Sequence, residues 1–347
     1  MREPVRVTCV SSYRPALAWF AAGTAGWAFV LVLLGAFTTS IGAGMVFADW
    51  PLSNGSLNPA GWLQNAAMFS EHAHRLSVGI MSALTLWLAG ALWRCEERRW
   101  LRRLGWIAVA LLIGQAVVGG LRVLLNPIDL PAVGTNVGQL FAMLHACLAQ
   151  TLVCVLVAIA AAVSRPWIEA APPSQSFGPG LRQFGRLCCG LLLAQLAIAA
   201  VMRHRYAGLA IPTFPLTPDG RLVPAHWDFA IAICFAHRVM TLVLAVALGS
   251  LAAAVWRHPA AGFGWKGLAW LVAVLLAAQI VLGVCIIWSA RDAFFTTAHV
   301  VVGALTLSAT FVLTLAMHRN IVEGAAETAD AAASTRTPTT GRVPAHA

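Results

Sequence analysis

Apolar residues are concentrated in eight long blocks along the chain, and short polar stretches separate these blocks. A block of about 20 apolar residues, at about 1.5 Å per residue, is long enough for a helix to cross the roughly 30 Å hydrocarbon core of a bilayer. The pattern therefore predicts an all-α membrane protein with eight transmembrane helices. The predicted spans are 16–38, 70–93, 105–125, 138–163, 187–202, 229–255, 267–288 and 296–317.

The composition agrees with this assignment and excludes several other classes of protein. Of the 347 residues, 59% are apolar and only 10% are charged, and the mean hydropathy is +0.77. These values exclude a soluble enzyme, a secreted disulfide scaffold and a disordered regulator. The eight cysteines form no CxxC motif and no loop holds a pair, so the sequence suggests neither a disulfide framework nor a zinc site.

The net charge of +10 comes from 23 basic and 13 acidic residues. The basic residues lie in loops rather than along one face, which indicates membrane orientation and not nucleic-acid binding. Sixteen of them fall on the side that holds both termini, so we expect both termini in the cytoplasm. The other seven lie mostly at or near the outer ends of spans and need another explanation: Arg75, Arg122, Arg203, Arg205, Arg221, Arg238 and Arg291.

The two ends of the chain add expectations about processing and location. The first apolar run, of about 22 residues, exceeds the roughly 7–15 residues of a signal-peptide core, so we expect an uncleaved span. Only about 15 residues precede it, which is short for a mitochondrial presequence and favours a bacterial inner membrane. The small, polar tail over 318–347 is expected to be disordered.

The second half of the chain repeats features of the first half at a nearly constant offset of 163–165 residues. The repeated features are Trp50-Pro51-Leu52 with Phe214-Pro215-Leu216, Pro59 with Pro224, His74-Arg75 with His237-Arg238, and Gln115 with Gln279. Both units start on the same side, so we predict two tandem four-helix bundles related by a pseudo-two-fold axis along the membrane normal. The predicted division is a tail over 1–15, an N-terminal half over 16–163, a cytoplasmic linker over 164–186, a C-terminal half over 187–317 and a tail over 318–347.

Each half contributes two histidines that lie a few residues inside the predicted outer boundary. They are His74, His145, His237 and His299, one on each of the second, fourth, sixth and eighth predicted helices. Ionisable residues within a bilayer are costly and by default indicate a functional site. Two imidazoles that face each other in a helical bundle suit bis-histidine ligation of haem iron. Arg75 and Arg238 follow two of these histidines, where a cation could pair with a haem propionate.

Two other interpretations of the histidines compete with haem ligation. The imidazoles could simply hydrogen-bond neighbouring helices, but the symmetric placement of four of them makes this the weaker interpretation. A copper site could also use histidine, yet neither methionine nor cysteine clusters beside these positions. The other histidines are expected at interfaces or in solvent, and His72, two residues from His74, lies on another face of its helix.

The two halves differ at one position beside the predicted sites. Glu71 lies about one helical turn before His74, whereas the matching residue of the second half is Cys234. A carboxylate near a helix N-terminus could be present only because the helix dipole favours it. We favour a proton acceptor or electrostatic stabiliser beside a reacting group in the first half, which makes Glu71 the candidate catalytic residue.

The remaining polar and small residues near the spans are given structural roles. Gln115 and Gln279 are expected to form interhelical hydrogen bonds, and Gly119, Gly120 and Gly283 to permit close helix packing. The acidic residues of the outer side are expected to be solvated in loops: Asp49, Asp219, Asp228 and Asp292.

Taken together, these motifs resemble those of the haem A synthase family. The resemblance covers about residues 17–317 and rests on Asp49-Trp50-Pro51, Glu71-x-x-His74-Arg75, GQAVVGGLRV over 114–123, His145, His237-Arg238 and His299-x-x-x-Gly303-Ala304. Some bacterial members carry a cysteine pair in the first outer loop. This loop has no cysteine here, so the chain is similar to the Cys-free branch, and the EHAHR stretch adds His72 as an extra candidate ligand.

The resemblance implies an oxidoreductase that converts haem O to haem A for cytochrome oxidase, in an eight-helix fold with duplicated halves. A ring methyl is oxidised to a formyl group by two successive hydroxylations, and the resulting gem-diol loses water to give the aldehyde. A haem in the second half would relay electrons. By resemblance, the site residues are His74, His145 and Arg75 for the substrate haem O, Glu71 for catalysis, and His237, His299 and Arg238 for a resident haem b.

Two other functions compete with the enzyme. A di-haem b electron-transfer protein without substrate chemistry also explains four histidines, but transmembrane transfer would place its haems at opposite faces, and it gives no role to Glu71. A transporter would need broken helices and charges near the bilayer centre.

Expected partners are haem O, a haem O synthase, cytochrome oxidase assembly factors, an unidentified electron partner and lipid. A homo-oligomer is allowed, and nucleic acid is not expected.

Overall fold

The computed structural model describes residues 12–169, 177–259 and 261–323. Within these ranges, eight helices are long and apolar enough to cross a membrane, which confirms the predicted all-α membrane fold. They are α1 (Pro15–Ser40), α2 (Ala66–Cys95), α3 (Arg99–Leu124), α4 (Val137–Ala162), α6 (Pro179–His204), α7 (Phe229–Arg257), α8 (Phe263–Trp288) and α9 (Ala293–Met317). The shorter elements are β1 (Asp129–Leu130), η1 (Pro131–Val133), β2 (Thr135–Asn136), α5 (Arg165–Glu169) and η2 (Ala207–Leu209).

The helices follow the predicted spans and extend beyond them at several ends. The largest difference is at α6, which starts at Pro179, eight residues before the predicted start at 187. A proline is favoured in the first turn of a helix, and the polar first turns continue the helix past its apolar segment. The predicted linker over 164–186 therefore contains α5 and the beginning of α6. The part of the predicted disordered tail after residue 323 lies outside the described residues.

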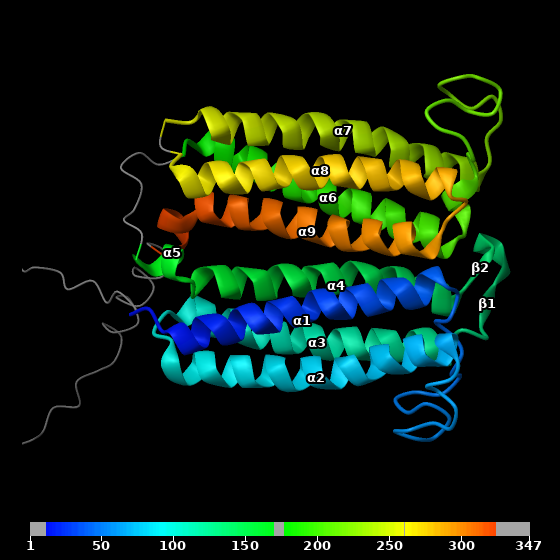
Figure 1. Ribbon diagram of the computed structural model, residues 1–347, viewed down its shortest axis with the longest axis horizontal. Coiled ribbons are helices and arrows are strands. Elements are labelled where there is room, and N and C mark those ends of the chain that lie inside the picture. The colour runs from blue at the N-terminus through cyan, green and yellow to red at the C-terminus, as the bar shows by residue number, and fades with distance from the viewer. Residues whose placement is uncertain (1–11, 170–176, 260, 324–347) are drawn as a thin grey trace, which may run out of the picture.

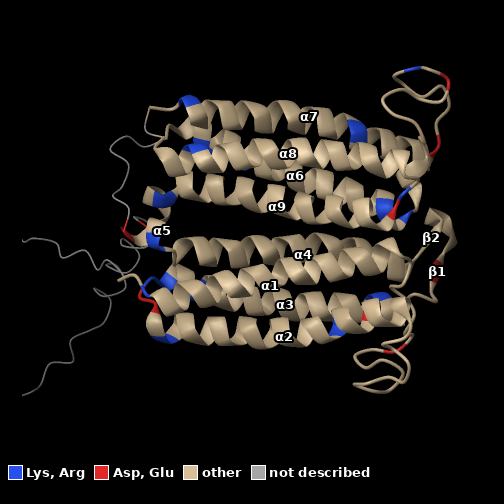
Figure 2. Ribbon diagram, in the orientation of Figure 1, with Lys and Arg blue, Asp and Glu red and all other residues tan. Residues whose placement is uncertain are grey.

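The long helices lie side by side in two groups of four, α1–α4 and α6–α9 (Figure 1). The groups meet where α1 and α4 pack against α9 and where α4 packs against α6. The two long connections, over 41–65 and 205–228, lie at the same end, which we call the loop end. The described chain begins and finishes at the opposite end, the terminal end, and charged residues gather at both ends of the helices (Figure 2). The pseudo-two-fold axis stays a prediction.

Each group of helices buries its own apolar core. The core of α1–α4 includes Met81, Leu88 and Leu156, all at most 1% exposed. The core of α6–α9 includes Leu248 and Leu251, which have no exposed surface. Most of the remaining apolar surface points outward, where lipid would cover it. Each half therefore has a packed interior of its own that can hold a site near the loop end.

The four histidine-bearing helices all begin at the loop end with a side-chain cap. Their N-cap residues are Asn65 for α2, Asn136 for α4, Asp228 for α7 and Asp292 for α9. Each side chain accepts hydrogen bonds from backbone N–H groups of the first turn, which would otherwise lack partners. Asp228 and Asp292 are exposed, as expected for solvated loop acids, and both also fix the starting point of a helix, which the sequence analysis did not predict.

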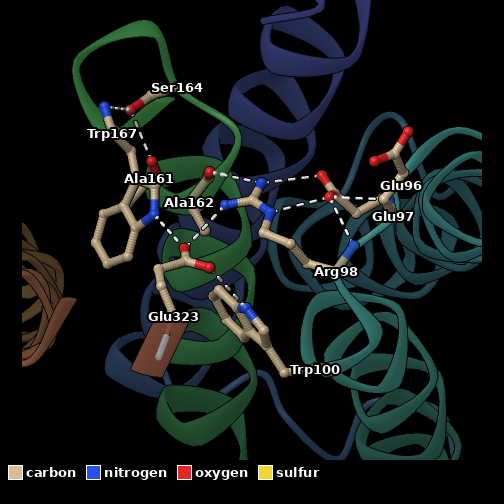
Figure 3. Close-up of polar contacts among 9 residues, drawn as sticks. All are labelled: Glu96, Glu97, Arg98, Trp100, Ala161, Ala162, Ser164, Trp167 and Glu323. Atoms are coloured by element: carbon tan, nitrogen blue, oxygen red, sulfur yellow. Dashed lines mark hydrogen bonds and ion pairs between the residues drawn. The ribbon is translucent and has the colours of Figure 1, made fainter. Parts of the chain in front are cut away.

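A polar network at the terminal end joins the segment after α9 to α3 and α4 (Figure 3). The Glu323 carboxylate accepts hydrogen bonds from Arg98 (3.1 Å), Trp167 Nε1 (2.8 Å) and Trp100 Nε1 (3.4 Å). Arg98 also binds the buried Glu96 carboxylate at 2.9 Å. Burial alone would raise the pKa of Glu96, but the hydrogen bonds and charge of Arg98 outweigh it and hold the pKa below its ordinary value. The network thus stabilises the contact between the two groups of helices.

Candidate functional site

The four candidate histidines form two pairs, one within each group of helices. His74, His145 and His237 are each the ninth residue of their helix, and His299 is the seventh of α9. At about 1.5 Å per residue, all four lie about 9–12 Å from the start of their helices at the loop end. His74 acts electrostatically on His145, and His237 on His299, so each imidazole has its neighbour in the same half.

In the second half, His237 of α7 and His299 of α9 face each other with their ring centroids 6.5 Å apart. A metal–nitrogen bond of about 2 Å, plus about 1 Å from the nitrogen to the ring centre, gives about 6 Å between two imidazoles on opposite sides of one metal atom. The observed separation fits that arrangement. Gln195 of α6 donates to the His237 carbonyl (3.1 Å) and to Thr241 Oγ1 (3.1 Å), which fixes α7 beside the pair.

In the first half, His145 is held by a reciprocal contact with α3. Gln115 Nε2 donates to the His145 carbonyl (2.9 Å), and His145 Nδ1 lies 3.2 Å from the Gln115 carbonyl. An Nδ1–H that donates to this carbonyl leaves Nε2 as the lone-pair nitrogen, as in histidines that ligate metals. The prediction of an interhelical hydrogen bond from Gln115 is confirmed, and its partner belongs to the candidate site itself.

Glycines supply the space in which these imidazoles lie. A Cβ at Gly119 would be 3.0 Å from His145 Cε1, and a Cβ at Gly35 of α1 would be 2.9 Å from His74 Cε1. A Cβ at Gly283 would be 3.4 Å from His299 Cε1, which is an ordinary contact. Gly119 therefore permits the close approach of a histidine-bearing helix, as the sequence predicts, whereas a side chain at Gly283 would make only an ordinary contact.

Three of the four histidines keep a buried ring nitrogen without a hydrogen-bond partner: Nδ1 of His74, of His237 and of His299. Backbone groups of Leu31 and Gln279 still act on the His74 and His299 rings, as Gln115 does on His145, so Nε2 is the ring nitrogen that could bind a ligand. Within the described ranges, no group of three or more His, Cys, Asp or Glu residues could hold a metal ion. Paired axial ligation of a planar metal complex fits these residues.

Glu71 lies beside the first pair and holds the first long loop. Its Oε2 accepts hydrogen bonds from the backbone N–H groups of Val46 (2.7 Å) and Phe47 (3.2 Å). Its Oε1 forms an ion pair with Arg75 Nη2 at 2.6 Å, and the charge of Arg122 also acts on it. Glu71 is only 5% exposed, so this network holds one buried negative charge on the His74 helix, about one turn before His74.

The two arginines that follow His74 and His237 use their donors on the long loops. Arg75 donates to the carbonyls of Asp49 (2.7 Å), Leu52 and Phe47 (3.2 Å). Arg238 Nη2 donates to the carbonyls of Ile211 and Thr213, both at 2.7 Å. Each arginine therefore anchors a loop over its own half. The sequence predicts pairing with haem propionates for both arginines and does not predict these loop contacts.

Other residues of the first loop are built into the same structure. Asp49 accepts hydrogen bonds from the N–H groups of Gly55 (2.7 Å) and Asn54 (2.8 Å), which hold the pKa of its carboxyl below the ordinary value. Trp50 packs on Gly120, where a Cβ would be 2.7 Å from the indole. His72 is 3% exposed, with Nδ1 3.0 Å from Ser53 Oγ and Nε2 3.2 Å from the Leu57 carbonyl. Both ring nitrogens of His72 therefore contact the first loop and not the pair of His74 and His145.

Sequence reasoning missed the contacts that cross between the halves. Arg203 of α6 donates to the Ala36 carbonyl (2.8 Å) and to Ser40 Oγ (2.9 Å) of α1. Thr297 of α9 donates to the same Ser40 hydroxyl at 3.2 Å. The only indication in the sequence was an arginine at the end of an apolar span, and the identity of its partners depends on tertiary packing.

These features define the class of the protein: a polytopic membrane protein with two intramembrane histidine pairs and one buried carboxylate beside the first pair. A family model described as cytochrome oxidase assembly protein matches residues 18–311. The chain therefore belongs to the cytochrome oxidase assembly protein family, and the resemblance to haem A synthases noted in the sequence is confirmed.

Several curated relatives are similar to this chain over most of its length. The heme A synthase of Geobacillus kaustophilus is 24% identical to this chain. The alignment covers 82% of this chain and 86% of the relative. The heme A synthase of Rhodospirillum centenum is 26% identical to this chain. The alignment covers 85% of this chain and 86% of the relative. The heme A synthase of Maricaulis maris is 38% identical over 115 residues, a segment that spans 30% of this chain and 33% of that protein.

Proposed function

We propose that this chain is a haem A synthase, an oxidoreductase that converts haem O to haem A in the biosynthesis of haem A for cytochrome oxidase. The observation that carries the proposal is the asymmetric pair of sites: two buried histidine pairs at one depth, with a carboxylate beside only one of them. A pure electron carrier has no use for this asymmetry, and the family membership does not favour it.

The two sites have different roles in this proposal. The first half binds the substrate haem O between His74 and His145, and the second half binds a resident haem b between His237 and His299. The 6.5 Å separation of the second pair supports a site in which His237 and His299 would together hold the haem. When bound, haem b supplies one-electron redox chemistry, which a side chain cannot provide.

The residues around the first pair position the reacting part of the substrate. Gln115 orients the His145 imidazole, and Gly35 and Gly119 leave room for the rings. Glu71 supplies a negative charge that can hold or accept a proton at its carboxylate oxygens. Arg75 donates to carbonyls of the first loop and so holds this loop at the same end of the helices.

The membrane arrangement follows from the distribution of basic residues. We propose that the chain spans a bacterial inner membrane with both termini in the cytoplasm, because basic loop residues favour the cytoplasmic side. The histidine pairs then lie near the outer face. A haem O synthase is the reaction partner that supplies the substrate, and cytochrome oxidase assembly factors receive the product. Fusing a reporter enzyme to residue 347 and to the loop over 205–228 tests this orientation.

The experiment that tests the function is a haem extraction. The chain is expressed with a haem O synthase in a host that lacks haem A, and the extracted haems are separated by chromatography. We expect haem A, identified by its mass and by the shifted pyridine haemochrome spectrum of its formyl group. Well-folded protein that contains haem b and unconverted haem O, without haem A, would instead support the electron carrier.

A glycine series tests whether the space around His145 matters. Replacing Gly119 with Ala places a methyl group 3.0 Å from His145 Cε1, so the imidazole must shift and strain its contact with Gln115. We expect haem affinity in the first half to fall by about 10-fold, as for other changes that displace a metal ligand. The measurement is a Soret titration of the purified protein.

The same helix provides a matched control for this substitution. A Cβ at Gly114 meets no atom within 4 Å, so Gly114→Ala should leave haem affinity unchanged and slightly raise the melting temperature, because Ala favours the helix. Gly283→Ala, with its 3.4 Å contact to His299, should be tolerated. Equal effects of Gly119→Ala and Gly114→Ala would show that the imidazole position does not depend on this contact.

A further inference from the structure

Three arginines at the loop end have no partner that explains their charge. They are Arg122 of α3, Arg203 of α6 and Arg291 of the turn before α9. The charges of Arg122 and Arg291 are close enough to repel that of Arg203. Among the ion pairs of the described chain, none includes any of the three. Like charges that gather at a partly buried place favour an anion between them.

The positions of Arg122 and Arg203 in the fold place them near the histidine pairs. Arg122 lies about one helical turn after Gly119, the glycine against which His145 packs, and its charge acts on His74 and on His145. The charge of Arg203 acts on His299 of the second pair. Arg122 and Arg203 therefore each lie near one candidate haem site, and they interact with each other across the boundary between the halves.

Most of the hydrogen-bond donors of these guanidiniums are unused. Arg122 lies against the backbone at Gly44, where a Cβ would clash with its guanidinium, and it donates no hydrogen bond to a described residue. Arg203 uses only Nη2, on the Ala36 carbonyl and the Ser40 hydroxyl. Guanidinium donors that bind no protein acceptor can bind a ligand that supplies oxygen atoms.

Glu71 is the anionic side chain whose charge acts on Arg122, and both of its oxygens already have hydrogen-bond partners. These partners are Arg75 and two backbone N–H groups. Arg75 and Arg238, in turn, are engaged by loop carbonyls. Arg122 and Arg203 both have donors that no described acceptor uses, and the planar fork of a guanidinium matches a carboxylate.

We propose that Arg122 binds a propionate carboxylate of the haem in the first half and that Arg203, with Arg291 beside it, binds a propionate of the haem in the second half. The inference rests on the proposed function, because it requires that a haem occupies each histidine pair. It assigns substrate and cofactor recognition to two arginines that the sequence leaves unexplained.

The test compares haem b with its dimethyl ester, in which both propionates have lost their charge. Full-length protein in phosphatidylcholine nanodiscs is titrated with each porphyrin, and the Soret band gives both dissociation constants. A His145→Ala background leaves only the second pair, and a His299→Ala background leaves only the first. Arg221→Gln is the control, because Arg221 is 67% exposed in a loop and pairs with Asp219.

We expect each background to bind the acid at least about tenfold more tightly than the ester. Arg203→Gln should remove this preference in the His145→Ala background and Arg122→Gln in the His299→Ala background, while the corresponding Lys variants keep part of it. Arg221→Gln should change nothing. An acid preference that survives both Gln substitutions would overturn the proposal.

Two further outcomes separate this inference from its alternatives. If the Gln variants release bound phospholipid, measured as phosphorus per protein, without changing the ratio of acid to ester affinity, the cluster binds a lipid headgroup and the proposal fails. If the unsubstituted chain binds neither porphyrin while remaining folded by circular dichroism, the haem sites themselves fail, and with them the proposed function.

Discussion

Replacing Glu71 with Gln should lower haem A formation by at least about 100-fold, while the spectrum of the haem b that we propose for the second half stays unchanged. The amide oxygen of Gln can still accept hydrogen bonds from the Val46 and Phe47 N–H groups, so the first loop keeps part of its attachment. What is lost is the negative charge beside the first histidine pair and its ion pair with Arg75. The measurement is haem A per milligram of purified protein in the coexpression assay.

The contacts of Glu71 require a test that separates its chemical role from its role in holding the loop. Arg75→Gln removes the 2.6 Å ion pair and the contacts with three loop carbonyls but leaves the carboxylate in place. If Glu71 acts only through the loop, Arg75→Gln should be at least as harmful as Glu71→Gln. If the carboxylate handles a proton, Glu71→Gln should be the more severe variant, and Glu71→Asp should retain measurable activity.

A matched control is available at the opposite end of the molecule. Glu97 is an exposed acid directly before Arg98 at the terminal end, so Glu97→Gln makes the same chemical change far from the histidine pairs. It should leave both haem A formation and haem b content unchanged. Haem A formation that persists in Glu71→Gln at the level of Glu97→Gln would remove Glu71 from the mechanism.

The sequence was sufficient for the features that depend on local composition. Eight apolar blocks predict eight helices because each block must satisfy its own backbone hydrogen bonds in lipid. His74 and His237 could be found because a single ionisable residue in an apolar helix is costly and therefore conspicuous. The offset of 163 residues between them came from the repeat, which also relates the capping residues Asn65 and Asp228.

Features that depend on the path of a loop or on contacts between halves could not be predicted. Nothing in the sequence near Arg75 shows that the loop over 41–65 returns to the Arg75 guanidinium. The sequence therefore leads us to expect that Arg75 binds a haem propionate. Gln195 and Arg203 could be recognised as polar residues in or at the end of an apolar span. Their partners, on α7 and α1, exist only after the helices pack. Side-chain direction at such contacts is a tertiary property.

If the second half holds haem b as we propose, replacing His237 or His299 with Ala should eliminate it, because each substitution removes one of the two histidines that would hold the iron. In the second half, the residue that matches Glu71 is Cys234, which is buried, and Gln195 is already bound to the α7 backbone. The haem-to-protein ratio from the pyridine haemochrome assay should fall to the background level. His226→Ala, in an exposed loop position, is the control and should retain the haem.

A second substitution separates loss of a ligand from loss of the fold. His237→Met keeps a metal-binding side chain at the same position, and exchanging one histidine ligand for methionine raises the reduction potential of haem. We therefore expect His237→Met to retain haem with a shifted Soret spectrum and a higher midpoint potential, whereas His237→Ala retains none. If both variants bind haem b normally and His74→Ala does not, the resident haem lies in the first half. In that case Glu71 would stand beside the cofactor, and the asymmetry between the halves would concern electron transfer rather than the substrate.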